Sequence, residues 1–308
     1  MCDINPGRLA YAKSYIGVSC PTFTDLDKML AETKPDKLIV TTVDATHHEQ
    51  IVYGLERGVD IITEKPMTTD EIKAQAILDA ERSTGRNVIV TFNYRYSPHR
   101  ARIKELLMAN AIGKVTSVDF HWYLDMEHGP RYFRRWHGLR AKGGTLLVHK
   151  STHHFDLLNW WLDSDPAEVV AHGALEFFGK NNSFRSTKCR GCSLAFNGTK
   201  GRLEAWIHER QSWPMEDYDE LRLTMNFGDT QFIRIPHGSG GHGGGDTRMK
   251  DKIFKDPSLS DPLKQSAGTR DGAMSILVGI AARKSIDSGQ PVQIASLTDL
   301  KPQAKRPE

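Results

Sequence analysis

Lys65 is the first candidate for chemistry, because it stands between Glu64 and Pro66 directly after the strand-like stretch 59–63. A proline restricts the residue before it to extended backbone, so the lysine amine is expected on a stiff backbone at a strand end. An amine held in a partly dry cleft can hydrogen-bond a substrate hydroxyl and lower the cost of removing its proton. Taken alone, the tripeptide favours the alternative, a solvated lysine before a helix.

A second candidate cluster is the segment 143–156, GGTLLVHKSTHHFD, in which His149 and His153 are four residues apart and so lie on one face of the expected helix. The pair is not a predicted metal site, because Lys150 follows His149 where His-Glu-x-x-His has its glutamate, and a cation disfavours zinc. Two histidines one turn apart disfavour each other's protonation, which would keep one neutral as a general base. A core histidine bonded to backbone is the alternative.

Polar side chains also follow expected strands at Asp3, Thr42 and Glu64. In an open α/β sheet, ligands bind beyond the carboxyl ends of the strands. Asp3 could accept both hydroxyl hydrogens of an adenosine ribose, and its charge would repel a 2′-phosphate, which favours NAD over NADP. An aspartate before Asn-Pro-Gly is equally good turn chemistry.

The glycine fingerprint that accompanies such an acid, GxGxxG, should lie about 20 residues before it. Only two residues precede Asp3, so the fingerprint is absent from this chain. A literal match at 238–243, GSGGHG, is rejected because it follows the expected strands of the second domain and no strand-ending acid comes after it. That loop is interpreted as a flap near the substrate or as a surface turn.

The element pattern predicts two domains. In residues 1–95, β-branched runs alternate with helical patterns, which indicates βαβ units and an incomplete Rossmann-like, doubly wound parallel sheet of the α/β class. The first strand of that sheet, with its phosphate loop, is missing. Its expected strands are the end of one at 2–4 and those at 37–43, 59–63 and 88–92, and its expected helices are 8–16, 24–32, 47–58 and 69–83.

Residues 96–308 are expected to form an α+β domain with a mostly antiparallel, open sheet. The helix expected at 145–162 is apolar on most faces and should be buried. The other expected helices are 98–110 and 271–288, and the expected strands are 114–124, 168–178 and 221–235.

Composition excludes several classes of protein. The chain has 308 residues and a formal net charge of +3, a surplus too small to indicate nucleic-acid or membrane binding. It has no apolar run of roughly 18 residues and no secretion leader. Its four cysteines make no disulfide framework, and Cys189 and Cys192 are interpreted as two reduced thiols rather than half a zinc site or a redox pair. A cytoplasmic location fits best.

Several stretches together resemble the Gfo/Idh/MocA family of NAD(P)-dependent sugar and polyol oxidoreductases. They include CDINPGR from Cys2, the run Thr42-Val43-Asp44-Ala45-Thr46-His47, GVDIITEKP, FNYRYSP, the histidine segment and the terminal RDGAMSILVGIAARKSIDSGQPV. The resemblance implies a Rossmann domain, an α+β domain whose open sheet packs against other subunits in a homo-oligomer, and a sugar or polyol substrate. It also implies NAD as the cofactor, with NADP the weaker alternative.

The resemblance assigns roles residue by residue. Lys65 would steady the substrate oxygen while His153 removes the hydroxyl proton and the adjacent carbon gives hydride to the nicotinamide. His149 falls where many members have aspartate, so the carboxylate that would orient the base is missing. The cofactor-binding set would be Asp3, Thr42, His47, Glu64, Lys65 and Asn93. The substrate set would be Arg95 with Arg131, Arg134, Trp136 and His137 of a basic, aromatic loop that could instead be plain surface.

Two departures from the family lead to alternatives. The missing first strand and a suspected internal deletion after Cys192 suggest a truncated chain with the ancestry but not the activity. Such a non-catalytic relative would associate through its second-domain sheet. A different enzyme class also fits, a glycoside hydrolase that retains NAD, oxidises the sugar transiently and returns the hydride. Metal-dependent hydrolysis is the weakest alternative.

Overall fold

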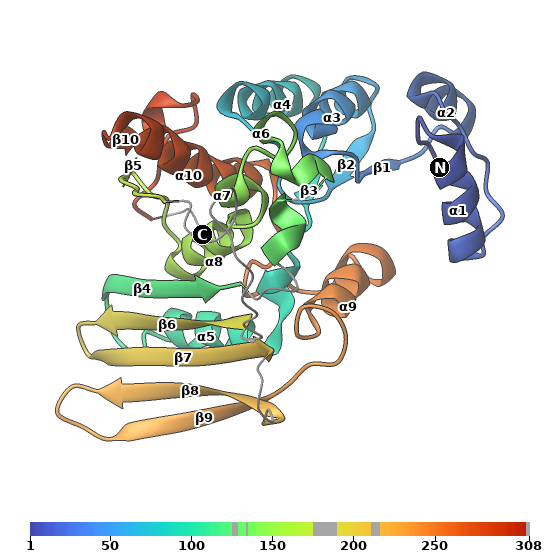
Figure 1. The fold of residues 1–308 in the computed structure, drawn as a ribbon. Coiled ribbons are helices and arrows are strands. Elements are labelled where there is room, and N and C mark those ends of the chain that lie inside the picture. The colour runs from blue at the N-terminus through green and yellow to red at the C-terminus, as the bar shows by residue number, and fades with distance from the viewer. Residues whose placement is uncertain (125–128, 134, 175–189, 211–215, 306–308) are drawn as a thin grey trace.

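The computed structural model describes residues 1–124, 129–133, 135–174, 190–210 and 216–305, and the features below concern these residues (Figure 1). The described chain forms two larger sheets and one small two-stranded sheet, with helices between and around them. The parallel sheet and its helices lie above, and the antiparallel sheet lies below in the view of Figure 1. This arrangement confirms the expected combination of a Rossmann-like domain with an α+β domain.

The upper sheet consists of three parallel strands in the order β1-β2-β3. They are β1 (Lys37–Val40), β2 (Asp60–Thr63) and β3 (Val88–Val90), and the helices α3 (His47–Glu56) and α4 (Glu71–Thr84) connect them. The apolar face of α3 packs on the sheet, and its Ile51 and Leu55 are fully buried. Parallel pairing with crossover helices brings the carboxyl ends of all three strands to one edge, where Thr42, Glu64 and Asn93 follow.

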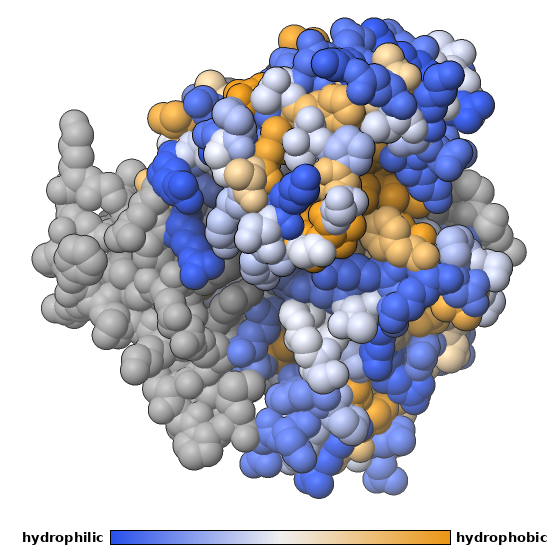
Figure 2. All heavy atoms as spheres, turned by 90° about the vertical axis from the view of Figure 1, so that its right-hand side faces the viewer, coloured by the Kyte–Doolittle hydropathy of each residue, from blue (hydrophilic) through white to orange (hydrophobic). Residues whose placement is uncertain are grey.

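The first 34 residues form a small unit beside β1, seen at the right of Figure 1. It holds α1 (Pro6–Ile16) and α2 (Leu26–Thr33), which begin at the side-chain caps Asn5 and Asp25. The strand end expected at 2–4 is a single bridge, in which Cys2 pairs with Phe23. Figure 2 faces this side and shows apolar residues in orange among hydrophilic ones; Ile4, Ile16 and Val18 are exposed apolar residues of this unit.

The lower sheet has five antiparallel strands in the order β4-β6-β7-β8-β9. They are β4 (Val115–Tyr123), β6 (Arg190–Gly198), β7 (Gly201–Arg210), β8 (Tyr218–Met225) and β9 (Thr230–Pro236). The strand expected at 221–235 is therefore a hairpin of two strands, and β6 and β7 were not expected. The helices α5 (Pro98–Met108) and α8 (Thr152–Leu162) bury their apolar side chains, including Trp160 and Trp161, with the inner face of this sheet.

The long helix expected at 145–162 is two helices, α7 (Leu146–His149) and α8, which are separated at Lys150 and Ser151. A preceding short helix, α6 (Arg140–Gly143), joins them to the basic loop. The break ends the regular helical spacing between His149 and His153. The expectation that α8 is buried holds, because eight of its eleven residues are buried.

The last long helix, α10 (Thr269–Ser288), returns from the second domain and packs into the apolar core of the parallel sheet. Gly279 lets α10 approach α7 closely, because a Cβ there would lie 2.4 Å from the carbonyl oxygen of Leu147. The helix ends at Gly289, whose φ of +70° suits glycine. Because α10 comes late in the chain and yet packs in the core of the parallel sheet, the expected domain boundary near residue 95 stays a prediction.

The remaining elements are short. β5 (Glu168–Val169) pairs with β10 (Val292–Gln293), and α9 (Gly245–Lys250) leads into the π-helical turn Asp251–Lys255. The 3₁₀ turns are Asp44–Thr46, Asn93–Tyr96, Gly129–Phe133, Arg135–Gly138 and Ile294–Ser296. No helix in the described ranges has both the length and the apolar character that crossing a membrane requires.

Candidate active site

Lys65 lies where β2 ends, and its side chain reaches the segment that carries the histidines. The amine Nζ donates a hydrogen bond to the carbonyl oxygen of His149 at 3.3 Å. Burial lowers the pKa of Lys65, while the carboxylates of Asp44 and Glu64 oppose that change. The lysine is therefore held at a strand end in a partly dry place, which is the environment that the Glu-Lys-Pro sequence indicated.

His149 is held by a carboxylate from the parallel sheet. Asp44, in the turn after β1, places Oδ2 2.5 Å from Nδ1 of His149. The side chain of Asp44 is 4% exposed and that of His149 is 12% exposed. Burial raises the pKa of Asp44 to about 7 and lowers the pKa of His149 to about 3. A carboxylate is therefore present at the site, but it contacts His149.

His153 is buried at the start of α8. Its ring stacks on Tyr94 with a centroid distance of 4.3 Å, and its Nδ1 has no hydrogen-bond partner among the described residues. Burial, followed by the charges of Lys65 and Lys150, holds the pKa of His153 well below its ordinary value. The Lys65 amine, which bonds the carbonyl oxygen of His149, is thus one of the charges that lower the pKa of His153.

The causes of the two histidine pKa shifts differ from the sequence-based expectation. Mutual repulsion between His149 and His153 was expected to keep one of them neutral. Instead, burial dominates for both, and the neighbouring charges that contribute most are those of Lys65 and Lys150.

Asn93 connects the end of β3 to the glycine-rich loop. Its Nδ2 donates to Oδ1 of Asp246 at 2.6 Å and lies 3.0 Å from Nδ1 of His242. The ring of His242 lies 5.3 Å from that of Tyr94 and 6.2 Å from that of His153. The loop at 237–246 therefore covers the histidine cluster, in agreement with its interpretation as a flap near the substrate.

The basic, aromatic loop supplies rings around His149. The rings of Trp136, His137 and Tyr132 have centroids 5.7, 4.7 and 5.4 Å from that of His149. Trp136 and His137 thus reach the site, as the sequence suggested. Arg131 is exposed in the same loop, and the predicted residue Arg134 lies outside the described residues.

The structure gives Arg95 a structural position rather than a place at the substrate. Its guanidinium is 2% exposed and donates to both carboxylate oxygens of Asp156, at 2.8 and 2.5 Å, and to Asp271 at 2.9 Å. A fourth hydrogen bond goes to the carbonyl oxygen of Lys264. Arg95 therefore ties α8 to α10, and the interpretation as a substrate ligand is replaced by this role.

The predicted cofactor-binding residues differ in burial and in the part of the fold that holds them. His47 is buried with its ring nitrogens 2.9 and 3.0 Å from the carbonyl oxygens of Pro66 and Thr42, so it clamps the ends of β1 and β2 together. Glu64 is exposed and accepts from Thr91 Oγ1 at 3.1 Å. Asp3 lies in the small N-terminal unit, where Oδ1 accepts from the Asn5 N–H at 2.8 Å.

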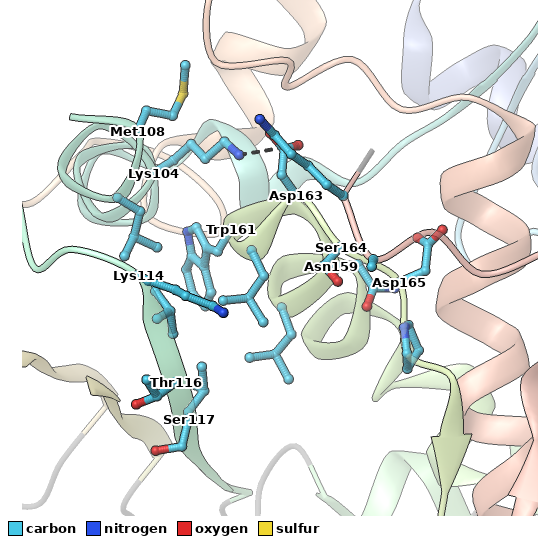
Figure 3. Close-up of a pocket in the computed structure, with 18 of the residues that line it drawn as sticks. Lys104, Met108, Lys114, Thr116, Ser117, Asn159, Trp161, Asp163, Ser164 and Asp165 are labelled. Carbon is cyan, nitrogen blue, oxygen red and sulfur yellow. Dashed lines mark ion pairs between the residues drawn. The ribbon is translucent and has the colours of Figure 1, made fainter. Parts of the chain in front are cut away.

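An open pocket of the described chain lies away from these residues. It is an open groove of 720 Å³ between α5, α8 and the edge strand β4, and it contains none of the predicted site residues (Figure 3). Lys104, at its upper rim in Figure 3, pairs with Asp163 at 3.6 Å and donates to the carbonyl oxygen of Trp160 at 2.6 Å. Cys189 and the side chain of Cys192 fall outside what the structure describes.

Sequence reasoning missed three residues of the site: Asp44, Tyr94 and His242. Each is polar or aromatic and follows an expected strand or lies in the glycine-rich loop, but no spacing rule pairs any of them with the histidine segment. Asp44 stands within the run that resembles the family and could have been identified from its place after β1. Contacts across 105 residues, as between Asp44 and His149, have no local signature.

Two family models match this chain in succession. Residues 1–92 match the oxidoreductase family model for an NAD-binding Rossmann fold, and residues 104–294 match the model for the C-terminal alpha/beta domain of the same family. The chain belongs to the Gfo/Idh/MocA oxidoreductase family. The two matched segments coincide with the parallel sheet and with the part that holds the antiparallel sheet.

Relatives of this Gfo/Idh/MocA oxidoreductase include YteT of Bacillus subtilis, which is 32% identical over 392 residues, covering 96% of this chain and 91% of YteT. That alignment is longer than this chain, so YteT carries residues within it that this chain lacks. An inositol 2-dehydrogenase/D-chiro-inositol 3-dehydrogenase of Lactiplantibacillus plantarum is 22% identical over 55% of this chain and 46% of its own length.

Solved structures share the fold. An oxidoreductase domain protein from Kribbella flavida has a TM-score of 0.74 at 21% identity, covering 95% of this chain and 89% of that protein. Levoglucosan dehydrogenase, solved with NADH and levoglucosan, also has a TM-score of 0.74, at 18% identity and with 95% and 89% coverage. At these identities the likeness establishes the architecture.

The residues of this Gfo/Idh/MocA oxidoreductase fit one end of a nicotinamide nucleotide. Asn93 Oδ1 is buried and has no hydrogen-bond partner among the described residues, and the Lys65 amine and the Glu64 carboxylate flank it at the neighbouring strand end. Such donors and acceptors suit a carboxamide and ribose hydroxyls. The first N–H groups of α1 are not available for phosphates, because those of Gly7 and Arg8 donate to the Asn5 side chain.

Proposed function

We propose that this protein is an NAD-dependent dehydrogenase that transfers a hydride between the nicotinamide and a hydroxyl-bearing carbon of a sugar or polyol. The observation that supports the proposal is the hydrogen bond from the Lys65 amine, at the end of β2, to the carbonyl oxygen of His149, four residues before His153, in a chain that matches an NAD-binding fold. An amine and an imidazole over one alcohol are the groups that removal of a hydroxyl proton requires.

Each residue of the proposed site has a separate role in the reaction. Lys65 donates a hydrogen bond to the substrate oxygen and stabilises the negative charge that develops on it. A histidine of the pair His149 and His153 takes the hydroxyl proton, since both are neutral at pH 7. Asn93 orients the carboxamide through its free Oδ1. Bound NAD supplies the acceptor for the hydride.

A polyhydroxylated substrate is supported by the surroundings of His149. Trp136 and Tyr132 offer apolar ring faces, and His137 and the exposed Arg131 offer hydrogen-bond donors. A sugar or polyol presents both C–H faces and hydroxyl groups, so this mixture matches it. Relatives named as inositol dehydrogenases point to the same substrate class.

The proposal includes two further features, the preference for NAD and the formation of a homo-oligomer. Asp3 favours NAD over NADP, because a carboxylate repels a 2′-phosphate. A homo-oligomer forms through the outer face of the antiparallel sheet, where aromatic side chains are exposed on three strands: Tyr123 is 56%, Trp206 61% and Phe232 54% exposed.

The reaction is tested with purified protein, NAD and a panel of polyols and sugars that includes inositol and levoglucosan. Absorbance at about 340 nm reports NADH, and calorimetry reports NAD binding. We expect NAD to bind and NADH to accumulate with at least one polyol. Sugar cleavage without net NADH would instead identify the redox-neutral glycoside hydrolase. A folded protein that binds no NAD would identify a non-catalytic relative.

A further inference from the structure

Asp44 and His149 form an isolated, buried contact that joins the two halves of the site. Asp44 follows β1 and His149 ends α7, and 105 residues separate them in the chain. Oδ2 of Asp44 lies 2.5 Å from Nδ1 of His149, and the carboxylate is 4% exposed. The contact engages Nδ1, whereas Nε2 of His149 has no hydrogen-bond partner among the described residues.

We propose that Asp44 positions His149 as the proton acceptor of the reaction, with His153 as a packing and orienting neighbour. Asp44 holds a proton on Nδ1 of His149, which leaves the lone pair of Nε2 for the substrate. The inference rests on the proposed function. When the alcohol is oxidised, the O–H proton passes to Nε2, the C–H bond breaks with its electron pair going to NAD, a C=O bond forms, and NAD is reduced to NADH.

The contacts of His153 make it the weaker candidate for the proton acceptor. Its side chain is almost wholly buried, its ring is stacked on Tyr94 at 4.3 Å, and its Nδ1 has no hydrogen-bond partner among the described residues. No carboxylate therefore fixes which of its nitrogens carries the proton. His149 has both a carboxylate to fix the tautomer and a partly exposed ring.

The charges around the pair set its pH dependence. His47 of α3, Lys65 at the end of β2 and His137 of the basic loop face Asp44, and Lys65, Lys150 and His47 face His149. Burial outweighs these charges and raises the pKa of Asp44 to about 7. Above that pH the carboxylate accepts from Nδ1–H, and Nε2 is a base. Below it, the carboxyl donates to Nδ1, so the proton of the neutral ring lies on Nε2 and that nitrogen no longer accepts a proton.

The experiment replaces Asp44 with asparagine. The amide of Asp44→Asn donates to Nδ1, so it holds the proton on Nε2, and polyol oxidation at pH 8 is expected to fall by about 10²–10⁴ in kcat while NAD affinity is unchanged. His149→Asn should fall by a similar factor, and the double variant should fall no further. His153→Asn should keep more activity than His149→Asn.

A second readout needs neither NAD nor turnover. ¹⁵N NMR of the imidazoles at pH 8 should show the His149 proton on Nδ1 in the wild type and on Nε2 in Asp44→Asn. The matched control is Asp219→Asn, since Asp219, on β8 of the antiparallel sheet, makes a similar buried contact to His99, Nδ1 to Oδ2 at 2.9 Å. This variant should leave the His149 signals unchanged.

Stability supplies a third readout with a definite sign. In the folded protein the pKa of Asp44 lies above its unfolded value of 3.8. The stability that the protonated carboxyl contributes is therefore complete below about pH 3.8 and is lost as the pH rises towards 7. The Tm of Asp44→Asn should therefore rise relative to wild type as the pH increases from about 4 to about 7.

The outcomes separate the two proposals. An unchanged His149 tautomer in Asp44→Asn, or full oxidation activity in that variant, overturns the Asp44–His149 pair even when the wild type forms NADH. A wild type that binds NAD but oxidises no polyol overturns the proposed function, whatever NMR shows. Loss of activity in His153→Asn with retention in His149→Asn would return the role of acceptor to His153.

Discussion

Replacing Lys65 with methionine is expected to lower kcat for polyol oxidation by about 10²–10⁴. Methionine keeps the length and apolar stem of the side chain but removes the hydrogen bond and charge that stabilise the developing alkoxide. The amine is held between the end of β2 and the carbonyl oxygen of His149, so no neighbouring lysine can replace it without a change of backbone. Steady-state kinetics with NAD and the best polyol of the panel measures the loss.

The control is Lys73→Met. Lys73 is also partly buried and paired, with Asp70 at 3.0 Å, but it lies on α4 outside the site. Its replacement should leave kcat within about twofold and NAD binding unchanged, and both variants should melt cooperatively. Wild-type kcat in a folded Lys65→Met protein would show that the amine takes no part in the reaction.

Arg95→Met is expected to cost about 3–5 kcal/mol of the free energy of unfolding. The substitution leaves the carboxylate of Asp156, which is 1% exposed, without its buried cation. It also releases Asp271 at the start of α10, the helix that fills the core of the parallel sheet. Thermal unfolding should show a decrease in Tm of about 10 °C.

Arg82→Met is the matched control, because Arg82 also contacts two carboxylates, those of Asp79 and Asp299, but its side chain is 55% exposed. Solvent screens such pairs, so the Tm should change little. Equal Tm values for the two variants would contradict the structural role of Arg95. If the Arg95→Met protein were stable and only its KM for polyol were raised, Arg95 would be a substrate ligand instead.

Much of the fold was predictable because its signals are local. The β-branched runs before Thr42 and Glu64 and the helical patterns between them indicate βαβ units without knowledge of any contact. Lys65 and His153 could be named as candidates from a strand-ending Glu-Lys-Pro and from the histidine segment, and their roles stay a prediction. The contact of the Lys65 amine with the carbonyl oxygen of His149, 84 residues away in the chain, is visible only in three dimensions.

The parts that were not predicted depend on distant contacts. The apolar periodicity of 145–162 continues across Lys150 and Ser151, so it conceals the break between α7 and α8. An arginine beside the expected nicotinamide site looks like a ligand until Asp156 and Asp271 are found to use its donors. Asp44 was overlooked for the same reason, since its partner is an element of the other half of the chain.

The transfer of deuterium tests the central claim most directly. The protein is incubated with NAD and a polyol that carries deuterium on its carbinol carbons, and the nucleotide and the sugar are analysed by mass spectrometry. If the protein passes a hydride from the carbinol carbon to NAD, NADH should gain one deuterium per turnover, and the ketone carbon should carry no label. NADH without deuterium, or a polyol that keeps all its label after exposure to NAD-bound protein, would contradict the account.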